Sequence, residues 1–281
     1  MGGLHSGLSI PAIGLGMLAL MLIAAGAGHG LRRLQAKRRR PNATESSESI
    51  AQEGYLLNSA LGLLGLLLAF TFAMVLSRYE ARRDLVMKEA NAIGTSYLRA
   101  QFLDEPYRTH LSVLLVEYTQ NRIQLASGEG DGGRYAARTD QLLADIWSNA
   151  RGARESAMTH GMTTVLLMTI NDVIDVDAER KIAWGLRLPT EVVVLLVIYL
   201  VMTAALVGHQ VNGPRGRRAG FVLFVSISLS ITVMADINAP QWGRSRESQA
   251  PMLMLLQSLR SQPPAVFDRF NSLALQPGRS P

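Results

Sequence analysis

Side chains that commonly catalyse reactions or ligate metals are sparse or scattered in this sequence. It has no cysteine, so a thiolate nucleophile, a cysteine-bound metal and a disulfide are all excluded within it. The five histidines, at positions 5, 29, 110, 160 and 209, show no paired spacing of the kind found in zinc sites. A Gly-x-Ser-x-Gly elbow is missing, and the glycine-rich run at 128–133 follows no predicted strand, so we interpret that run as a loop between helices. We therefore expect neither an enzyme nor a cofactor.

One group of acidic residues has a spacing that could place oxygen ligands together. Asp172, Asp175 and Glu179 share one face of a predicted helix, and hard cations prefer such ligands. Arg180 and Lys181 follow directly, which is more typical of an ordinary solvated, charged face. The metal site therefore remains the weaker alternative.

The net charge is +6, but its distribution does not indicate a nucleic-acid-binding protein. Acidic and basic residues nearly balance across the large polar segment from 78 to 188, so the excess lies close to the apolar segments. Membrane lipids with anionic headgroups are the expected partners, and nucleic acid is not.

Four apolar segments are long enough to cross a bilayer as helices. We predict an all-α, four-helix integral membrane protein in which a long second helix extends into a water-exposed helical bundle inserted between membrane helices 2 and 3. The predicted parts are a first membrane helix with a basic and polar linker (1–54), a second membrane helix (55–77), the water-exposed domain (78–188), a hairpin of helices 3 and 4 (189–235) and a C-terminal tail (236–281). A cleaved signal peptide is the alternative for the first segment, but its basic residues follow the apolar block, which favours a retained anchor.

The second segment organises this plan. From 52 to 103 the chain has no proline and keeps apolar residues at helical spacing, so we predict one continuous helix about 75 Å long. Further helices are expected near 106–125, 135–149 and 156–184, with a short amphipathic one at 252–259 and a loosely ordered end after it. In the fourth apolar segment, hydroxyls recur at Ser226, Ser228, Ser230 and Thr232. Hydrogen bonding to neighbouring helices is favoured there over a polar pore lining.

Basic residues predict the orientation in the membrane. Six of them follow the first apolar segment, between 32 and 40, and Arg215, Arg217 and Arg218 lie between the third and fourth. The positive-inside rule places both loops in the cytoplasm, and hence the helical domain outside it. A multi-pass protein of a bacterial inner membrane is expected.

Three stretches carry a resemblance to a known family: KEANAIGTSYLRAQFLDEPYR, then INDVIDVDAERKIAWGLRLP before a membrane helix, and DINAPQWGRSRESQAPML after the last one. Over about residues 55–256 the sequence resembles the bacterial bestrophin-like membrane family. This resemblance implies four membrane helices with a helical insert between the second and third. It also implies a more distant kinship to the bestrophins, which are pentameric anion channels. On that analogy the second helix lines a pore in a homo-oligomer, with chloride or another small anion as the permeant species.

Residues for such a pore follow from helical geometry. Steps of three and four residues keep one face of the second helix, and the candidates on it are Leu66, Phe70, Ala73, Met74 and Ser77. An apolar constriction of this kind can gate by dewetting, and Arg78, Arg82 and Arg83 are the candidates for a basic mouth. Ordinary helix packing is the alternative for the apolar residues.

Two features differ from the bestrophins, and they leave a second function open. Bestrophins keep the helical domain in the cytoplasm, and the segment after the last membrane helix here has only Asp236 and Glu247 as acidic residues. A non-conducting scaffold or sensor, whose helical domain binds a partner, is the alternative. A transporter is disfavoured, because charged residues are absent from the interior of all four membrane segments, Glu191 standing at the start of the third.

Overall fold

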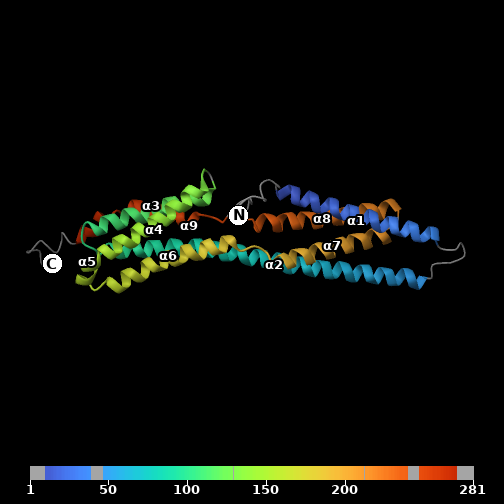
Figure 1. The fold of residues 1–281 in the computed structure, drawn as a ribbon, viewed down its shortest axis with the longest axis horizontal. Coiled ribbons are helices and arrows are strands. Elements are labelled where there is room, and N and C mark those ends of the chain that lie inside the picture. Colours follow the sequence, from blue (N-terminus) through green and yellow to red (C-terminus); the bar gives the residue numbers. More distant parts are fainter. Residues whose placement is uncertain (1–9, 39–46, 129, 212, 240–246, 271–281) are drawn as a thin grey trace, which may run out of the picture. The chain divides into compact units, whose positions relative to one another are not determined.

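The computed structural model describes residues 10–38, 47–128, 130–211, 213–239 and 247–270, and every regular element in these ranges is helical. The nine α-helices are α1 (Ile10–Arg38), α2 (Ser47–Ala100), α3 (Tyr107–Ser127), α4 (Gly132–Gly152), α5 (Arg154–Thr159), α6 (Thr163–Gly185), α7 (Thr190–Gln210), α8 (Gly213–Ile237) and α9 (Ala250–Ser261), followed by the 3-10 helix η1 (Pro264–Phe270) (Figure 1). The all-α prediction is confirmed.

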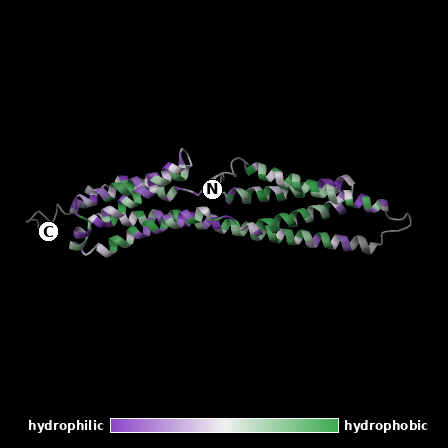
Figure 2. Ribbon diagram, viewed as in Figure 1, coloured by the Kyte–Doolittle hydropathy of each residue, from purple (hydrophilic) through white to green (hydrophobic). Residues whose placement is uncertain are grey.

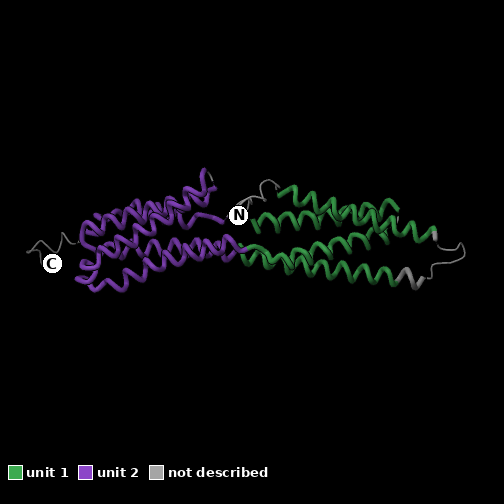
Figure 3. The backbone as a smooth tube through the Cα atoms, in the orientation of Figure 1, with its two compact units in different colours: residues 1–79, 187–246 green, residues 80–186, 247–281 purple. Residues whose placement is uncertain are grey.

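The chain divides into two compact units, coloured separately in Figure 3. Unit 1 comprises residues 1–79 and 187–246, and unit 2 comprises residues 80–186 and 247–281. The 54-residue helix α2 contributes its first part to unit 1 and its last part to unit 2, so the predicted uninterrupted helix is confirmed.

Unit 1 holds the apolar helices. Four helices of the described chain are long and apolar enough to span a membrane, and hydrophobic residues dominate α1, α7, α8 and the first part of α2 (Figure 2). The first helix continues through the basic residues as far as Arg38. Between α7 and α8 only residues 211 and 212 intervene, so Arg215, Arg217 and Arg218 lie in the first two turns of α8.

Helix α1 packs closely on α7 because small residues face each other. A Cβ atom added at Gly208 would lie 1.9 Å from the carbonyl oxygen of Ala25, and one added at Gly28 would lie 2.0 Å from that of Ala205. Membrane helices lack a hydrophobic driving force between them and gain from such close backbone approach. These two glycines therefore set the spacing of the α1–α7 pair.

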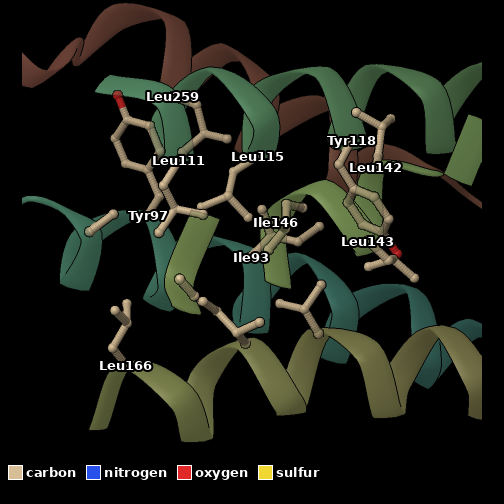
Figure 4. Packing of buried hydrophobic residues seen from close by; sticks show 14 of the residues in the cluster. Ile93, Tyr97, Leu111, Leu115, Tyr118, Leu142, Leu143, Ile146, Leu166 and Leu259 are labelled. Carbon is tan, nitrogen blue, oxygen red and sulfur yellow. The ribbon is translucent and has the colours of Figure 1, made fainter. Parts of the chain in front are cut away.

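Unit 2 is a helical bundle with its own apolar core. Figure 4 shows side chains from α2, α3, α4, α6 and α9 meeting there, and its labelled members are Ile93, Tyr97, Leu111, Leu115, Tyr118, Leu142, Leu143, Ile146, Leu166 and Leu259. Local signals set the helix ends as well. The Asp131 carboxylate accepts hydrogen bonds from the backbone amides of Gly133 and Arg134 and caps α4, while Gly128 ends α3 at φ 65°.

Two segments of unit 2 differ from the sequence prediction. The expected single helix at 156–184 is broken into α5 and α6 by a turn in which Gly161 has φ 63°. The chain after α9, expected to be loosely ordered, continues as η1 as far as Phe270 and packs on the bundle, and residues 271–281 lie outside the described residues. There the Arg108 guanidinium binds the Asp268 carboxylate, with distances of 2.9 and 2.5 Å, and the Tyr97 hydroxyl donates to the Gln262 carbonyl at 2.8 Å.

Candidate functional site

One face of α2 within unit 1 is left uncovered by the rest of that unit. We call it the open face, and its residues are Leu66, Phe70, Ala73, Met74 and Ser77. All five are exposed, and Phe70 retains 64% of its accessible surface. The five predicted side chains therefore share an exposed side of α2, and Leu63, Phe72 and Leu76 of the same stretch are exposed as well.

The other side of the same helix provides the intramolecular packing. Leu64, Thr71 and Val75 are buried, and Val75 retains only 1% of its surface. At 100° per residue, the centre of these three positions lies roughly 140° around the helix from the centre of the open face. Thr71 satisfies its hydroxyl on its own helix, donating to the Leu67 carbonyl at 2.8 Å. The helix thus uses one face to hold unit 1 together and leaves another available.

The chemistry of the open face is that of a non-polar wall. From 55 to 77 the sequence has no charged residue, and Ser77 supplies the one hydroxyl among the five side chains. Such a wall can contact lipid, pack against a second copy of the chain, or line a constriction between several copies. It offers no group for acid–base or covalent chemistry.

The three basic mouth candidates occupy different environments. The Arg78 guanidinium donates to the backbone carbonyl of Arg187 within unit 1. In unit 2, Arg82 is buried and its Nε donates to the Glu247 carboxylate, whereas Arg83 is exposed. The structure therefore does not bring these three guanidinium groups together, and Arg83 is the one that remains solvent-facing.

Two acidic residues of α2 were missed as candidates for the pore mouth. Glu80 and Asp84 are exposed, and they follow Ser77 by three and seven residues, a spacing that keeps one face of a helix. Tracing this spacing beyond the apolar segment would have found them from the sequence alone.

The hydroxyls of α8 are satisfied by backbone carbonyls. Ser228 donates to the carbonyl of Gly14 on α1 at 2.7 Å, so it links two helices of unit 1. The other three bond within α8: Ser226 to Val222, Ser230 to Ser226 and Thr232 to Ser228. Only Ser228 therefore shows the favoured hydrogen bonding to a neighbouring helix, and the other three hydroxyls are satisfied within α8.

The acidic residues proposed as weak metal ligands are solvent-exposed. Asp172, Asp175 and Glu179 all lie on the exposed face of α6. Among the described residues, no group of three or more histidine or acidic side chains is arranged to hold a metal ion. The solvated-face interpretation fits these positions.

Unit 2 contains a buried charge network that the sequence did not reveal. The fully buried Glu89 carboxylate accepts a hydrogen bond from the Tyr118 hydroxyl at 2.7 Å, lies 2.8 Å from Arg122 Nε and also binds Arg180. Asp177 lies 3.1 Å from the Arg122 guanidinium, so two carboxylates face two guanidinium groups. Buried charges are tolerated when paired in this way.

Burial and the surrounding charges shift proton equilibria in this network. Desolvation and the adjacent Glu89 charge raise the pKa of Tyr118 well above its ordinary value. Desolvation opposes the charge of Arg122, but Glu89, Tyr118 and Asp177 more than compensate, and the pKa of Arg122 is raised. The network is therefore charge-balanced, which indicates a structural role rather than a ligand site.

Comparison with known proteins relates this architecture to one family. A model of the bestrophin-like domain matches residues 21–252, which is most of the chain. The chain belongs to the bestrophin-like family. The match confirms the resemblance predicted over 55–256 and extends it into α1. No curated protein matches the sequence at a significant level.

Solved structures agree with the bestrophin-like fold. A bacterial bestrophin homologue from Klebsiella pneumoniae, in a variant with a tyrosine changed to alanine, matches with a TM-score of 0.58 at 13% identity, over 90% of this chain and 98% of that one. Its variant with a tryptophan changed to alanine matches with a TM-score of 0.60 at 12% identity, over 94% and 100% of the two chains. At these identities the similarity establishes the fold alone. The family match and the four apolar helices together identify a bestrophin-type membrane protein.

Proposed function

We propose that this bestrophin-like protein is an oligomeric passive ion channel in which the open face of α2 lines the pathway. The observation that carries the proposal is the uncovered, uncharged face itself, opposite the side of α2 that packs within unit 1. Family kinship implies chloride or another small anion as the permeant species. The proposal needs no catalytic group, which agrees with the absence of a recognisable enzyme motif from the sequence.

The geometry explains why several copies are required. A single helix face cannot enclose a water-filled passage, whereas copies arranged in a ring would turn their open faces toward a common axis. Apolar side chains such as Leu66, Phe70 and Met74 would then form successive rings. Rings of this kind can close by dewetting and open with a small increase in radius.

Flux measurements on reconstituted oligomers test this function, and the helix supplies its own control. Phe70 is on the open face, whereas Phe72 is a partly exposed phenylalanine on another side of the same helix. We expect Phe70→Ala to raise the flux of chloride or of a small cation severalfold, because it widens an apolar ring, and Phe72→Ala to leave it near the wild-type value. Absence of flux from a well-formed oligomer, or an equal response of the two variants, would contradict the proposal.

A scaffold or sensor is the second candidate, and exposed apolar side chains of unit 2 favour it. Met158, Met168 and Ile182 each expose more than half of their surface, and a bound partner protein would cover such side chains. The oligomeric state in mild detergent separates the two functions, because a pore lined by one helix per subunit requires a ring. A stable monomer would favour the scaffold or sensor.

We also propose that the protein lies in a bacterial inner membrane with unit 2 outside the cytoplasm, as the basic residues near α1 and α8 indicate. The natural absence of cysteine allows a direct test. Gly132 is exposed, and a Cβ there meets no atom within 4 Å, whereas Gly130 has φ 82° and would be strained by a side chain. We expect a membrane-impermeant thiol reagent to label Gly132→Cys in intact cells. Labelling only after lysis would place the domain in the cytoplasm.

A further inference from the structure

Three buried polar residues recur on α2 within unit 2 at intervals of seven residues. They are Arg82, Glu89 and Ser96, and all are at most 2% exposed. Seven residues make nearly two helical turns, so the three side chains lie on one face of the helix. A second set with the same interval is buried beside them and is entirely apolar: Val86, Ile93 and Ala100. Leu85, Ala90 and Tyr97 are buried as well, so each polar position is followed by two apolar positions in every heptad.

Each polar residue has a partner of a different chemical kind. Arg82 donates to the Glu247 carboxylate in the segment before α9. Glu89 binds the guanidinium groups of Arg122 on α3 and Arg180 on α6, together with the Tyr118 hydroxyl. The third contact is neutral, because the Ser96 hydroxyl donates to the Thr169 carbonyl of α6 at 3.1 Å.

The apolar positions distinguish the alignments by side-chain size alone. A shift of seven residues would exchange Val86 and Ile93 at modest cost, whereas exchanging Ile93 with Ala100, or Ala90 with Tyr97, changes the packed volume. Buried polar positions add a second criterion, because they select one alignment by charge.

The polar set distinguishes the observed alignment from both shifted ones. Shifted one way, the Arg82 guanidinium would replace the Glu89 carboxylate and face Arg122 and Arg180. Shifted the other way, the Glu89 carboxylate would replace Arg82 and face Glu247. Either arrangement buries like charges against each other without compensation, which is strongly unfavourable in a protein interior.

We propose that Arg82, Glu89 and Ser96 are register determinants that select a single axial position and rotation of α2 within unit 2. The apolar positions stabilise the packing of α2 in unit 2, and the opposite charges of Arg82 and Glu89 select its alignment. This role concerns the fold of unit 2 and holds whether or not the protein conducts ions.

Cross-linking between α2 and α9 measures this register directly, because the chain has no natural cysteine. A Cβ at Gly94 would lie 3.2 Å from Leu255 Cδ1, so Gly94→Cys with Leu255→Cys is the native reporter pair. Met87→Cys or Gln101→Cys, each combined with Leu255→Cys, reports a shift of seven residues in either direction. In full-length protein with the network intact, a short bismaleimide should join only the native pair.

The decisive variant replaces the charges around Glu89 by uncharged groups: Glu89→Leu with Arg122→Leu and Arg180→Met, and Asp177→Asn so that no buried carboxylate loses its Arg122 partner. We expect the yield of the native pair to fall at least twofold, and a product to form with one of the shifted pairs. A matched control removes the partly exposed ion pair of α3 and α4, through Glu117→Leu with Arg138→Leu, and should leave the native yield unchanged.

A second variant keeps the proposal testable if the apolar variant fails to fold. Glu89→Gln preserves the shape of the side chain and an acceptor for Tyr118 but removes the charge that selects the alignment. It should give the same change in cross-linking with smaller amplitude. An unchanged native yield with no shifted product would overturn the proposal, whether in the folded apolar variant or, if that variant loses its helical circular dichroism, in Glu89→Gln.

Discussion

The spacing of α1 and α7 gives a sharp mutational prediction, because it depends on two glycines. In Gly208→Ala the new methyl group would start 1.9 Å from the Ala25 carbonyl oxygen, whereas real Cβ contacts are essentially never shorter than 3.0 Å. The obstacle is backbone rather than a flexible side chain, so the helices must separate by more than 1 Å at this point. Overpacking usually costs about 1–3 kcal/mol, and we expect a loss of ~3 kcal/mol of unfolding free energy here.

The same helix pair supplies the comparison variants. Gly28→Ala should behave like Gly208→Ala, since its methyl group would lie 2.0 Å from the Ala205 carbonyl oxygen. The double variant should cost less than the sum, because the helices separate only once. Gly26→Ala, where a Cβ meets no atom within 4 Å, is the control and should change stability by no more than about 1 kcal/mol. Unfolding in mixed micelles by titration with a denaturing detergent, followed by circular dichroism, measures all four. Equal midpoints for Gly208→Ala and Gly26→Ala would refute the close packing.

Three further predictions concern individual hydrogen bonds. Tyr118→Phe should cost about 1–3 kcal/mol at neutral pH, because the buried Glu89 carboxylate loses a donor. The raised pKa of Tyr118 means that the phenol's contribution is complete below pH 10 and is lost at higher pH, so denaturation curves of wild type and variant should converge above pH 10. Arg108→Met should release the segment after α9, and limited proteolysis there should accelerate about fivefold, the effect of losing ~1 kcal/mol from a partly exposed ion pair with Asp268. Ser228→Ala should lower stability by about 0.5–1.5 kcal/mol in the same unfolding titration, because the hydroxyl bonded to the α1 backbone is lost. An unchanged curve or cleavage rate would contradict the corresponding contact.

Much of the fold could be predicted because its strongest signals are local. Apolar segments of membrane length and an unbroken helical period from 52 to 103 define the membrane helices and α2 directly. The break between α5 and α6 was missed because a single glycine, Gly161, is also tolerated within helices. The docking of η1 was missed for a different reason. It depends on Arg108 and Tyr97, which lie more than 150 residues earlier in the sequence.

Part of the candidate site was likewise predictable from the local sequence, and part was not. The open face follows from helical angles alone, so the positions of Phe70 and its neighbours were predictable. The burial of charged residues was not predictable, because Glu89 lies beside Lys88 in a stretch of sequence that is typical of a solvent-exposed helix. Its burial depends on helices α3 and α6, which the local sequence does not specify. Similarly, nothing near Arg82 in the sequence indicates its pairing with Glu247.

The most direct test of the proposed channel is whether the open face of α2 contacts the permeating ions. Ala73→Cys places a thiol on this face, and Leu229→Cys places one on an exposed position of α8. Both variants would be reconstituted in liposomes, and ion flux measured before and after treatment with a charged, water-soluble thiol reagent. The account predicts that the reagent changes flux at least severalfold in Ala73→Cys and leaves it unaltered in Leu229→Cys and in the cysteine-free parent. Flux through Ala73→Cys that is insensitive to complete modification would contradict the placement of the pathway along α2.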